Sequence, residues 1–201
     1  MKVYLTEFIG TFFLVLVIAL TGSPLAIGAA LTALVYMGGY ISGAHYNPAV
    51  TLGLLLSKKI KSPIALRYMI VQLIGAICAA GMFYLITGSH FTASIAPKVP
   101  VISALLIETV FTFLLVTVVL NTAATDKTKG NDYYGAAIGL TVMAAATAGG
   151  GLSGGAFNPA VGLGPILFDI AHLQSHLVNA GVYFVGPFLG GAAASVVYKQ
   201  K

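Results

Sequence analysis

The stretch SGAHYNPAVTLG at Ser42–Gly53 returns 111 positions later, at Ser153–Gly164, as SGGAFNPAVGLG. Both copies place glycine shortly before an Asn-Pro-Ala triplet. A residue that precedes proline is disfavoured in helical geometry, whereas proline suits the first position of a helix. We therefore predict that the asparagine of each copy caps a helix that begins at Pro48 in the first copy and at Pro159 in the second.

The composition places these helices in a membrane. Of 201 residues, 58% are hydrophobic and 7% are charged, against about 25% charged in soluble domains. Six apolar runs predict six membrane spans: Phe8–Leu20, Leu25–Ile41, Ile64–Ile86, Val101–Leu120, Tyr133–Ala148 and Leu177–Tyr198. A secretory signal peptide is the alternative for the first run, but Glu7 interrupts the basic leader that such a signal needs.

The two helices that follow the Asn-Pro-Ala triplets are too short to cross a bilayer. We expect one to run from Asn47 to about Ser57 and the other from Asn158 to about Phe168, at about 1.5 Å per residue. The glycine-rich approach to each helix indicates extended backbone, which is tolerated at membrane depth only inside protein or along a watery cavity. Carbonyl groups are therefore expected to face a permeant at Gly43, Ala44, His45, Gly154, Gly155 and Ala156.

The basic residues predict an orientation. Nine of the ten fall at the termini or in the second and fourth connections: Lys2, Lys58, Lys59, Lys61, Arg67, Lys127, Lys129, Lys199 and Lys201. The positive-inside rule makes that side cytoplasmic, so we expect both termini inside the cell membrane. A nucleic-acid partner is not expected from the net charge of +5, because the basic residues are dispersed and not interleaved with aromatic ones.

The two halves resemble each other beyond the triplets. TEFIGTFFLV at Thr6–Val15 pairs with IETVFTFLLV at Ile107–Val116, and QLIGAI at Gln72–Ile77 resembles PFLGGA at Pro187–Ala192. Each half holds three spans, an odd number, so the second half would enter the membrane from the opposite side. We therefore expect an all-α membrane protein with six transmembrane helices and two re-entrant half-helices, a single channel domain 1–201 made of inverted repeats of about 1–99 and 100–201.

These motifs resemble those of the major intrinsic protein family, the aquaporins and glycerol facilitators, along essentially the whole chain. The resemblance implies a homotetramer in the lipid membrane with one pore in each subunit. The pore motifs would be Asn47, Pro48, Ala49, Asn158, Pro159 and Ala160. Both asparagine amides would point into the pore, where the positive ends of the half-helices repel cations and protons.

An acidic residue inside a membrane span is by default a functional candidate. Glu7 and Glu108 occupy matching positions of the two halves. The resemblance implies that they accept hydrogen bonds from the re-entrant loops and so brace them. A proton relay is the alternative, and no chain of titratable partners accompanies them.

The family resemblance places the selectivity filter at Ile27, Ala146, Gly155 and Val161. Most members carry arginine where this chain has Val161, so we expect a wide, apolar filter that passes water and small uncharged solutes such as glycerol, urea, similar polyols and neutral hydroxides. Other markers conflict: Gly162 stands where glycerol-conducting relatives carry aspartate. A strict water channel is the first alternative, followed by a secondary transporter and a non-conducting structural protein.

No residue pattern predicts an enzyme, a cofactor or a metal site. His90, His172 and His176 are expected near the outer surface without a Ser, Asp or Cys partner to complete a triad or a metal site. Cys78, the single cysteine, is expected to be a small buried thiol within a span.

Overall fold

The computed structural model describes residues 1–199, and all six predicted spans are helices within this range. The six long helices are α1 (Lys2–Thr21), α2 (Pro24–Ser42), α4 (Ser62–Thr87), α5 (Val101–Thr122), α6 (Tyr134–Ser153) and α8 (Leu173–Lys199). Two short 3-10 turns, η1 (Asp126–Thr128) and η2 (Ile170–His172), lie in connections. The last long helix begins four residues before the predicted Leu177, because its first turn is polar and an apolar run cannot reveal it.

The two predicted half-helices are also present. α3 spans Pro48–Leu56 and α7 spans Pro159–Phe168, each with proline in its first turn and an asparagine N-cap. After α3, the amides of Lys58 and Lys59 donate to carbonyls of the last turn at 2.9 and 2.8 Å. These two lysines therefore satisfy the carbonyl end of the helix through their backbone amides.

Glycines end four of the long helices. Gly22, Gly43, Gly88 and Gly154 have φ of 59°, 89°, 72° and 91°, and each donates its amide to a carbonyl of the preceding turn. This left-handed conformation costs a residue with a side chain more than it costs glycine. Gly43 and Gly154 thus turn the chain from a membrane span into a re-entrant loop.

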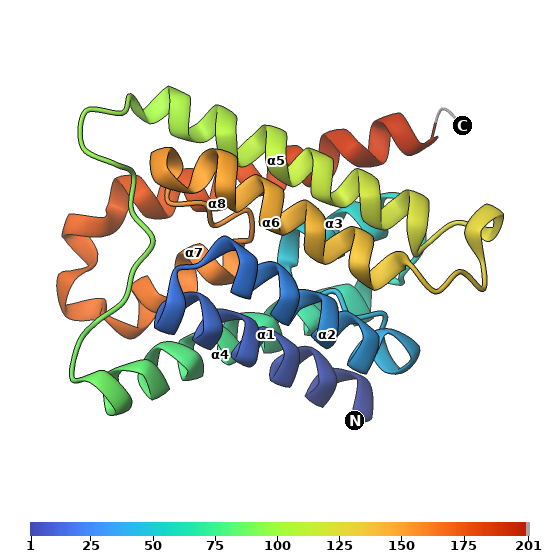
Figure 1. Ribbon diagram of the computed structural model, residues 1–201, viewed down its shortest axis with the longest axis horizontal. Coiled ribbons are helices and arrows are strands. Elements are labelled where there is room, and N and C mark those ends of the chain that lie inside the picture. The colour runs from blue at the N-terminus through green and yellow to red at the C-terminus, as the bar shows by residue number, and fades with distance from the viewer. Residues whose placement is uncertain (200–201) are drawn as a thin grey trace.

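The six long helices form two similar groups, and each half-helix packs mainly on the group from the other half of the chain. α1 packs on α2 and α4, α5 packs on α6 and α8, and α2 contacts α6 between the groups. α3 packs mainly on α8 and α7 mainly on α4, so each half-helix is held largely by the other half of the chain. Figure 1 shows the six long helices running side by side around the two short ones, with both termini at one end of the molecule.

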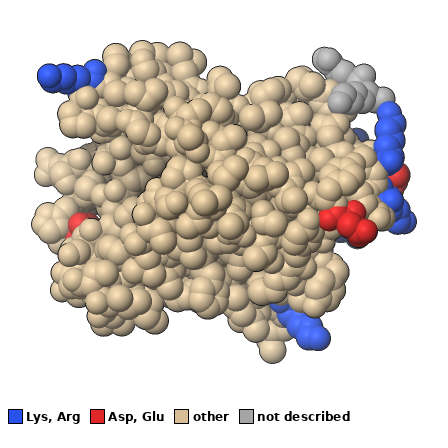
Figure 2. Space-filling view, in the orientation of Figure 1, with Lys and Arg blue, Asp and Glu red and all other residues tan. Residues whose placement is uncertain are grey.

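The surface separates charged ends from an apolar belt. In Figure 2 the visible blue and red side chains lie toward the ends of the molecule, and the belt between them is tan. Many large apolar side chains are exposed on this belt, including Leu66, Leu106 and Val110. Cys78 is exposed on α4 rather than buried, so its prediction was wrong: the span is apolar all round, and its sequence does not reveal which face is turned outward.

Candidate functional site

The two asparagine N-caps lie at the centre of the molecule and bind each other's loops. The Asn47 Oδ1 accepts from the amide of Ala49 at 2.8 Å, while its Nδ2 donates to the carbonyl of Phe157 at 2.9 Å. The Asn158 Nδ2 donates to the carbonyl of Tyr46, also at 2.9 Å. A side-chain amide has two N–H donors, so each asparagine keeps one donor for another partner.

The re-entrant loops leave backbone acceptors free. Tyr68 Oη donates to the carbonyl of Ser42 at 2.9 Å, and Tyr183 Oη donates to that of Ser153 at 2.6 Å. Between these tyrosine contacts and the asparagine contacts lie six backbone carbonyls that accept no hydrogen bond within residues 1–199. They are those of Gly43, Ala44, His45, Gly154, Gly155 and Ala156, the residues predicted to offer carbonyls to a permeant.

Glu7 collects the donors of the first loop. Its Oε1 accepts from Ser42 Oγ at 2.6 Å and from the amide of His45 at 3.0 Å. Its Oε2 accepts from the amide of Tyr46 and from Gln72 Nε2, both at 2.8 Å. Four donors therefore surround one fully buried carboxylate, and hydrogen bonds to a charged acceptor are among the stronger ones in proteins.

Glu108 holds the second loop with three donors. Its Oε1 accepts from Ser153 Oγ at 2.8 Å and from the amide of Ala156 at 3.0 Å, and its Oε2 accepts from the amide of Phe157 at 2.6 Å. The position that matches Gln72 in the second half is Pro187, which has no donor. The two braces are therefore similar but not equivalent.

Sequence reasoning missed the polar residues that support the braces. Ser42 and Ser153 open the two quoted stretches, and Tyr68 and Tyr183 recur in the spans that follow them. The recurrence of these serines and tyrosines in both halves is the sequence signal that could have identified them. Gln72 has no counterpart, so only its position inside a span could have marked it.

The predicted filter residues line a cavity that passes the asparagines. The cavity is about 40 Å³ and is lined by Ile27, Ala146, Gly155 and Val161 together with Asn47, Asn158 and the carbonyl-bearing loop residues Ala44, His45 and Ala156. The remaining wall is aliphatic except for Tyr46 and Phe157. A water molecule needs roughly 10–15 Å³ of such volume, so the cavity has room for about three waters.

A vestibule meets this cavity at the filter. It has a volume of about 490 Å³, and Ile27, Ala146 and Gly155 line both spaces. A second vestibule of about 460 Å³ lies between α2 and residues 122–134, toward the end that carries the termini. Three of the four filter candidates therefore stand where a wide vestibule narrows to the cavity.

None of the four filter candidates carries a polar side-chain atom. Gly155 has a φ of +65°, and a Cβ placed on it would lie 2.8 Å from the Cα of Gly150. A side chain at this position is therefore excluded by conformation and by space. His45 adds a ring to the cavity wall, with its Nδ1 at 3.0 Å from Thr51 Oγ1.

The histidines at the end opposite the termini have a partner that the sequence reasoning did not assign. Asp169 Oδ1 lies 2.8 Å from His172 Nδ1 and 3.5 Å from His90 Nδ1. The sequence prediction concerned only a partner that would complete a triad or a metal site, and it did not foresee this pairing, because His90 and Asp169 are far apart in sequence and meet where α7 packs on α4. Within residues 1–199 no group of three or more ligands is arranged to hold a metal ion.

Six spanning helices around a cavity framed by two half-helix N-termini define a membrane channel. The chain belongs to the major intrinsic protein family, which it matches over residues 1–198. It is 36% identical to "Glycerol uptake facilitator protein-like 6" of Lactiplantibacillus plantarum, and the match covers 97% of this chain and 95% of the relative. It is 34% identical to aquaporin AqpM of Methanothermobacter thermautotrophicus, with the same two coverages.

A solved structure shares the fold. The X-ray structure of the aquaglyceroporin from Plasmodium falciparum superposes with a TM-score of 0.81, covers 99% of this chain and 93% of its own, and is 24% identical. The chain is thus a multi-pass membrane protein of a channel family and not an enzyme. It is a passive channel for water and small solutes.

Proposed function

We propose that this channel conducts small uncharged solutes such as glycerol and urea together with water, through a filter formed by Ile27, Ala146, Gly155 and Val161. The observation that carries the proposal is that all four residues line the narrow cavity, that Ile27, Ala146 and Gly155 also line the vestibule, and that none presents a polar side-chain atom there. Relatives named as a glycerol uptake facilitator and as aquaporins support both kinds of permeant.

The cavity wall explains how a neutral molecule crosses. The re-entrant loops offer free carbonyls as acceptors, with Ala44, His45, Gly155 and Ala156 in the wall of the cavity and Gly43 and Gly154 in the walls of the vestibules. Asn47 and Asn158 each offer one donor between them. A permeant that loses water partners regains polar ones along this row, whereas an unpaired polar group costs about 1–3 kcal/mol. The aliphatic wall opposite suits the carbon skeleton of a polyol.

Ions meet two obstacles in the same passage. The lining offers no charged side chain to replace the hydration shell of an ion, and the desolvation of an ion costs several kcal/mol. The N-termini of α3 and α7 also direct their partial positive charges at the cavity, which opposes cations and protons. Passage is thus restricted to uncharged species.

The filter valine is tested by substitution with Arg and, as a matched control, with Ala. Purified Val161→Arg is expected to reduce glycerol and urea permeability about tenfold relative to water in proteoliposomes, because a fixed cation and its donors narrow the filter. Val161→Ala adds no donor and is expected to keep or raise solute flux. Stopped-flow light scattering measures all three permeants, and a pH dye measures proton leak.

The wild-type protein decides between the proposal and its rivals. Fast water flux beside glycerol and urea rates equal to those of empty liposomes would show a strict water channel and overturn the broader filter. Saturable flux coupled to an ion gradient would indicate a secondary transporter. No flux of any kind from correctly folded protein would indicate a structural role.

We also infer the arrangement in the cell. The basic residues support a cytoplasmic location of both termini by the positive-inside rule, with Lys199 described only in its backbone and Lys201 outside the described residues. The paired contacts of Glu7 with one loop and Glu108 with the other support inverted repeats of about 1–99 and 100–201. The exposed apolar belt supports burial in the cell membrane and a homotetramer.

A further inference from the structure

A connecting segment crosses the end of the molecule where the filter vestibule opens. It joins α4 to α5 through residues 88–100 and is drawn in Figure 1 as a thin green loop that passes over the ends of other helices. One backbone bond fixes its later part, since the amide of Ala96 donates to the carbonyl of Leu152 in α6 at 3.0 Å. The segment is therefore tied to the wall of the vestibule.

His90 fixes the earlier part of this segment to the other side. Its Nδ1 lies 3.5 Å from Asp169 Oδ1 at the end of α7. Its ring also packs on Tyr84 and Phe168, with centroid distances of 4.9 and 5.9 Å. Asp169 is buried although it lies at this end of the molecule. The contact therefore joins His90 to a buried carboxyl group and not to a freely exposed one.

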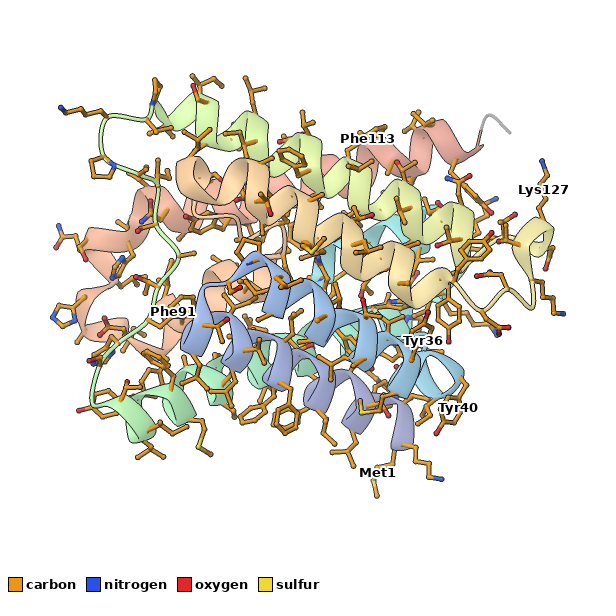
Figure 3. All side chains as sticks on the ribbon, viewed as in Figure 1. Met1, Tyr36, Tyr40, Phe91, Phe113 and Lys127 are labelled. Atoms are coloured by element: carbon orange, nitrogen blue, oxygen red, sulfur yellow. The ribbon has the colours of Figure 1, made fainter. Side chains whose placement is uncertain are left out.

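Phe91 stands between these two attachments and lines the vestibule. It is the only aromatic side chain among the described residues of that lining, and it makes a T-shaped contact with Phe83 at 6.0 Å. Figure 3 shows Phe91 on the crossing segment at the open end, close to the end of the α1–α2 pair. The same vestibule includes the filter residues Ile27 and Ala146.

The opposite wall of the vestibule lacks bulk. Gly150 and Gly151 of α6 line it, and a Cβ added to either would meet no atom within 4 Å. Filter positions Ala146 and Gly155 add one methyl group between them. Phe91 is therefore the largest side chain of the vestibule lining.

We propose that Phe91 is a specificity-determining residue that sets the upper size of the solute, and that the His90–Asp169 contact is the positioning contact that holds Phe91 over the vestibule. The inference rests on the proposed conduction of solutes larger than water. An aromatic ring excludes a bulky solute sterically and passes a slim one beside it. Loss of the His90 contact frees the segment at one end and lets the ring swing out.

The groups around the contact favour an ionised Asp169. The hydrogen bond from His172 to Asp169 holds the pKa of that carboxyl below its usual value, and the charges of His90 and His176 act in the same direction. The groups that face His90 are Asp169 from α7, His172 from η2 and Tyr84 from α4.

The first experiment measures solute size selectivity in proteoliposomes. Phe91→Ala is expected to raise erythritol permeability at least threefold and glycerol permeability about twofold, while water permeability changes by less than twofold. Phe91→Leu, which keeps apolar bulk, is expected to fall between. Gel filtration and retained water flux confirm folding. Unchanged erythritol-to-water ratios in both variants would overturn the role of Phe91.

The second experiment tests whether His90 acts through Phe91. His90→Ala and Asp169→Asn are expected to raise the erythritol-to-water ratio as Phe91→Ala does, and the double variant His90→Ala/Phe91→Ala to go no further than Phe91→Ala alone. His176→Ala, which removes a nearby histidine without a direct contact to Asp169, is the matched control and leaves the ratio unchanged. Additive effects in the double variant would show that His90 does not position Phe91.

A conservative variant provides a readout that simple loss of stability would not give. His90→Gln, which keeps a side-chain donor for Asp169, is expected to hold the erythritol-to-water ratio closer to that of the wild type than His90→Ala does. Equal ratios in His90→Gln and His90→Ala would overturn the positioning contact. If the wild type passes only water while Phe91→Ala gains glycerol flux, the size-limiting role of Phe91 is supported and the proposed function is refuted. If the wild type conducts glycerol and Phe91→Ala leaves its selectivity unchanged, only the role of Phe91 is refuted.

Discussion

The two buried glutamates differ in how many hydrogen-bond donors face each carboxylate oxygen. Each Glu7 oxygen receives two donors, whereas Glu108 Oε1 receives two and its Oε2 receives one. A glutamine in either place must turn an NH₂ group toward one of these sites. The cost depends on how many donors that group then faces, so the repeated acids are not interchangeable.

Glu7→Gln is expected to destabilise the protein more than Glu108→Gln. The NH₂ group of a glutamine at position 7 faces two donors in either orientation, whereas at position 108 it can face only one, and a donor left unpaired costs about 1–3 kcal/mol. Thermal unfolding of the purified protein in detergent compares the two midpoints. Equal midpoints, or a lower one for Glu108→Gln, would contradict the donor count.

At the scale of elements, glycines set how closely the helices approach. A Cβ on Gly75 of α4 would lie 2.7 Å from the carbonyl oxygen of Phe8 in α1, and one on Gly190 of α8 would collide with the carbonyl of Thr109 in α5. The two helix pairs thus meet backbone to backbone at matching places. Small residues allow such contacts in membranes, where helix association lacks a strong hydrophobic driving force.

Gly75→Ala is expected to destabilise the protein by about 1–3 kcal/mol, because the new methyl group overpacks the contact with α1. Gly181→Ala is the matched control, since a Cβ on that helical glycine meets nothing within 4 Å and alanine favours helix by up to about 1 kcal/mol. Unfolding midpoints of both variants measure the difference. A midpoint for Gly75→Ala at or above that of Gly181→Ala would refute the close contact.

The elements were predictable because their signals are local. Proline after asparagine fixed the start of both half-helices to the residue, and long apolar runs gave all six spans. The faces of those spans were not predictable, because a membrane helix is apolar on every side, as the exposed Cys78 shows. The Asp169 cluster and the Gln72 brace were missed for a related reason: each joins residues of distant segments, and a single sequence does not reveal which segments touch.

At the scale of the whole molecule, charge asymmetry determines the expected orientation. In Figure 3, Lys127 and Met1 lie toward the end that carries the termini, and Phe91 lies toward the other. Positively charged connections are retained on the cytoplasmic side during insertion. The vestibule beside Phe91 is therefore expected to open to the outside of the cell.

Single cysteines in a Cys78→Ala background test this orientation. Ser89→Cys is expected to react with a membrane-impermeant maleimide in intact cells, whereas Lys127→Cys reacts only after permeabilisation. Both positions are exposed, so accessibility alone does not separate them. The reverse labelling pattern would place the termini outside.

The paired asparagines also connect the two halves of the chain. Asn47 and Asn158 each bind the loop of the other half and both line the narrow cavity, so the two halves are joined at the cavity itself. A substitution there alters permeation and assembly at once. The asparagine pair is thus less free to vary than the filter residues. A change of solute during evolution is expected to come from substitutions in the filter and the vestibule rather than from substitutions of the asparagines.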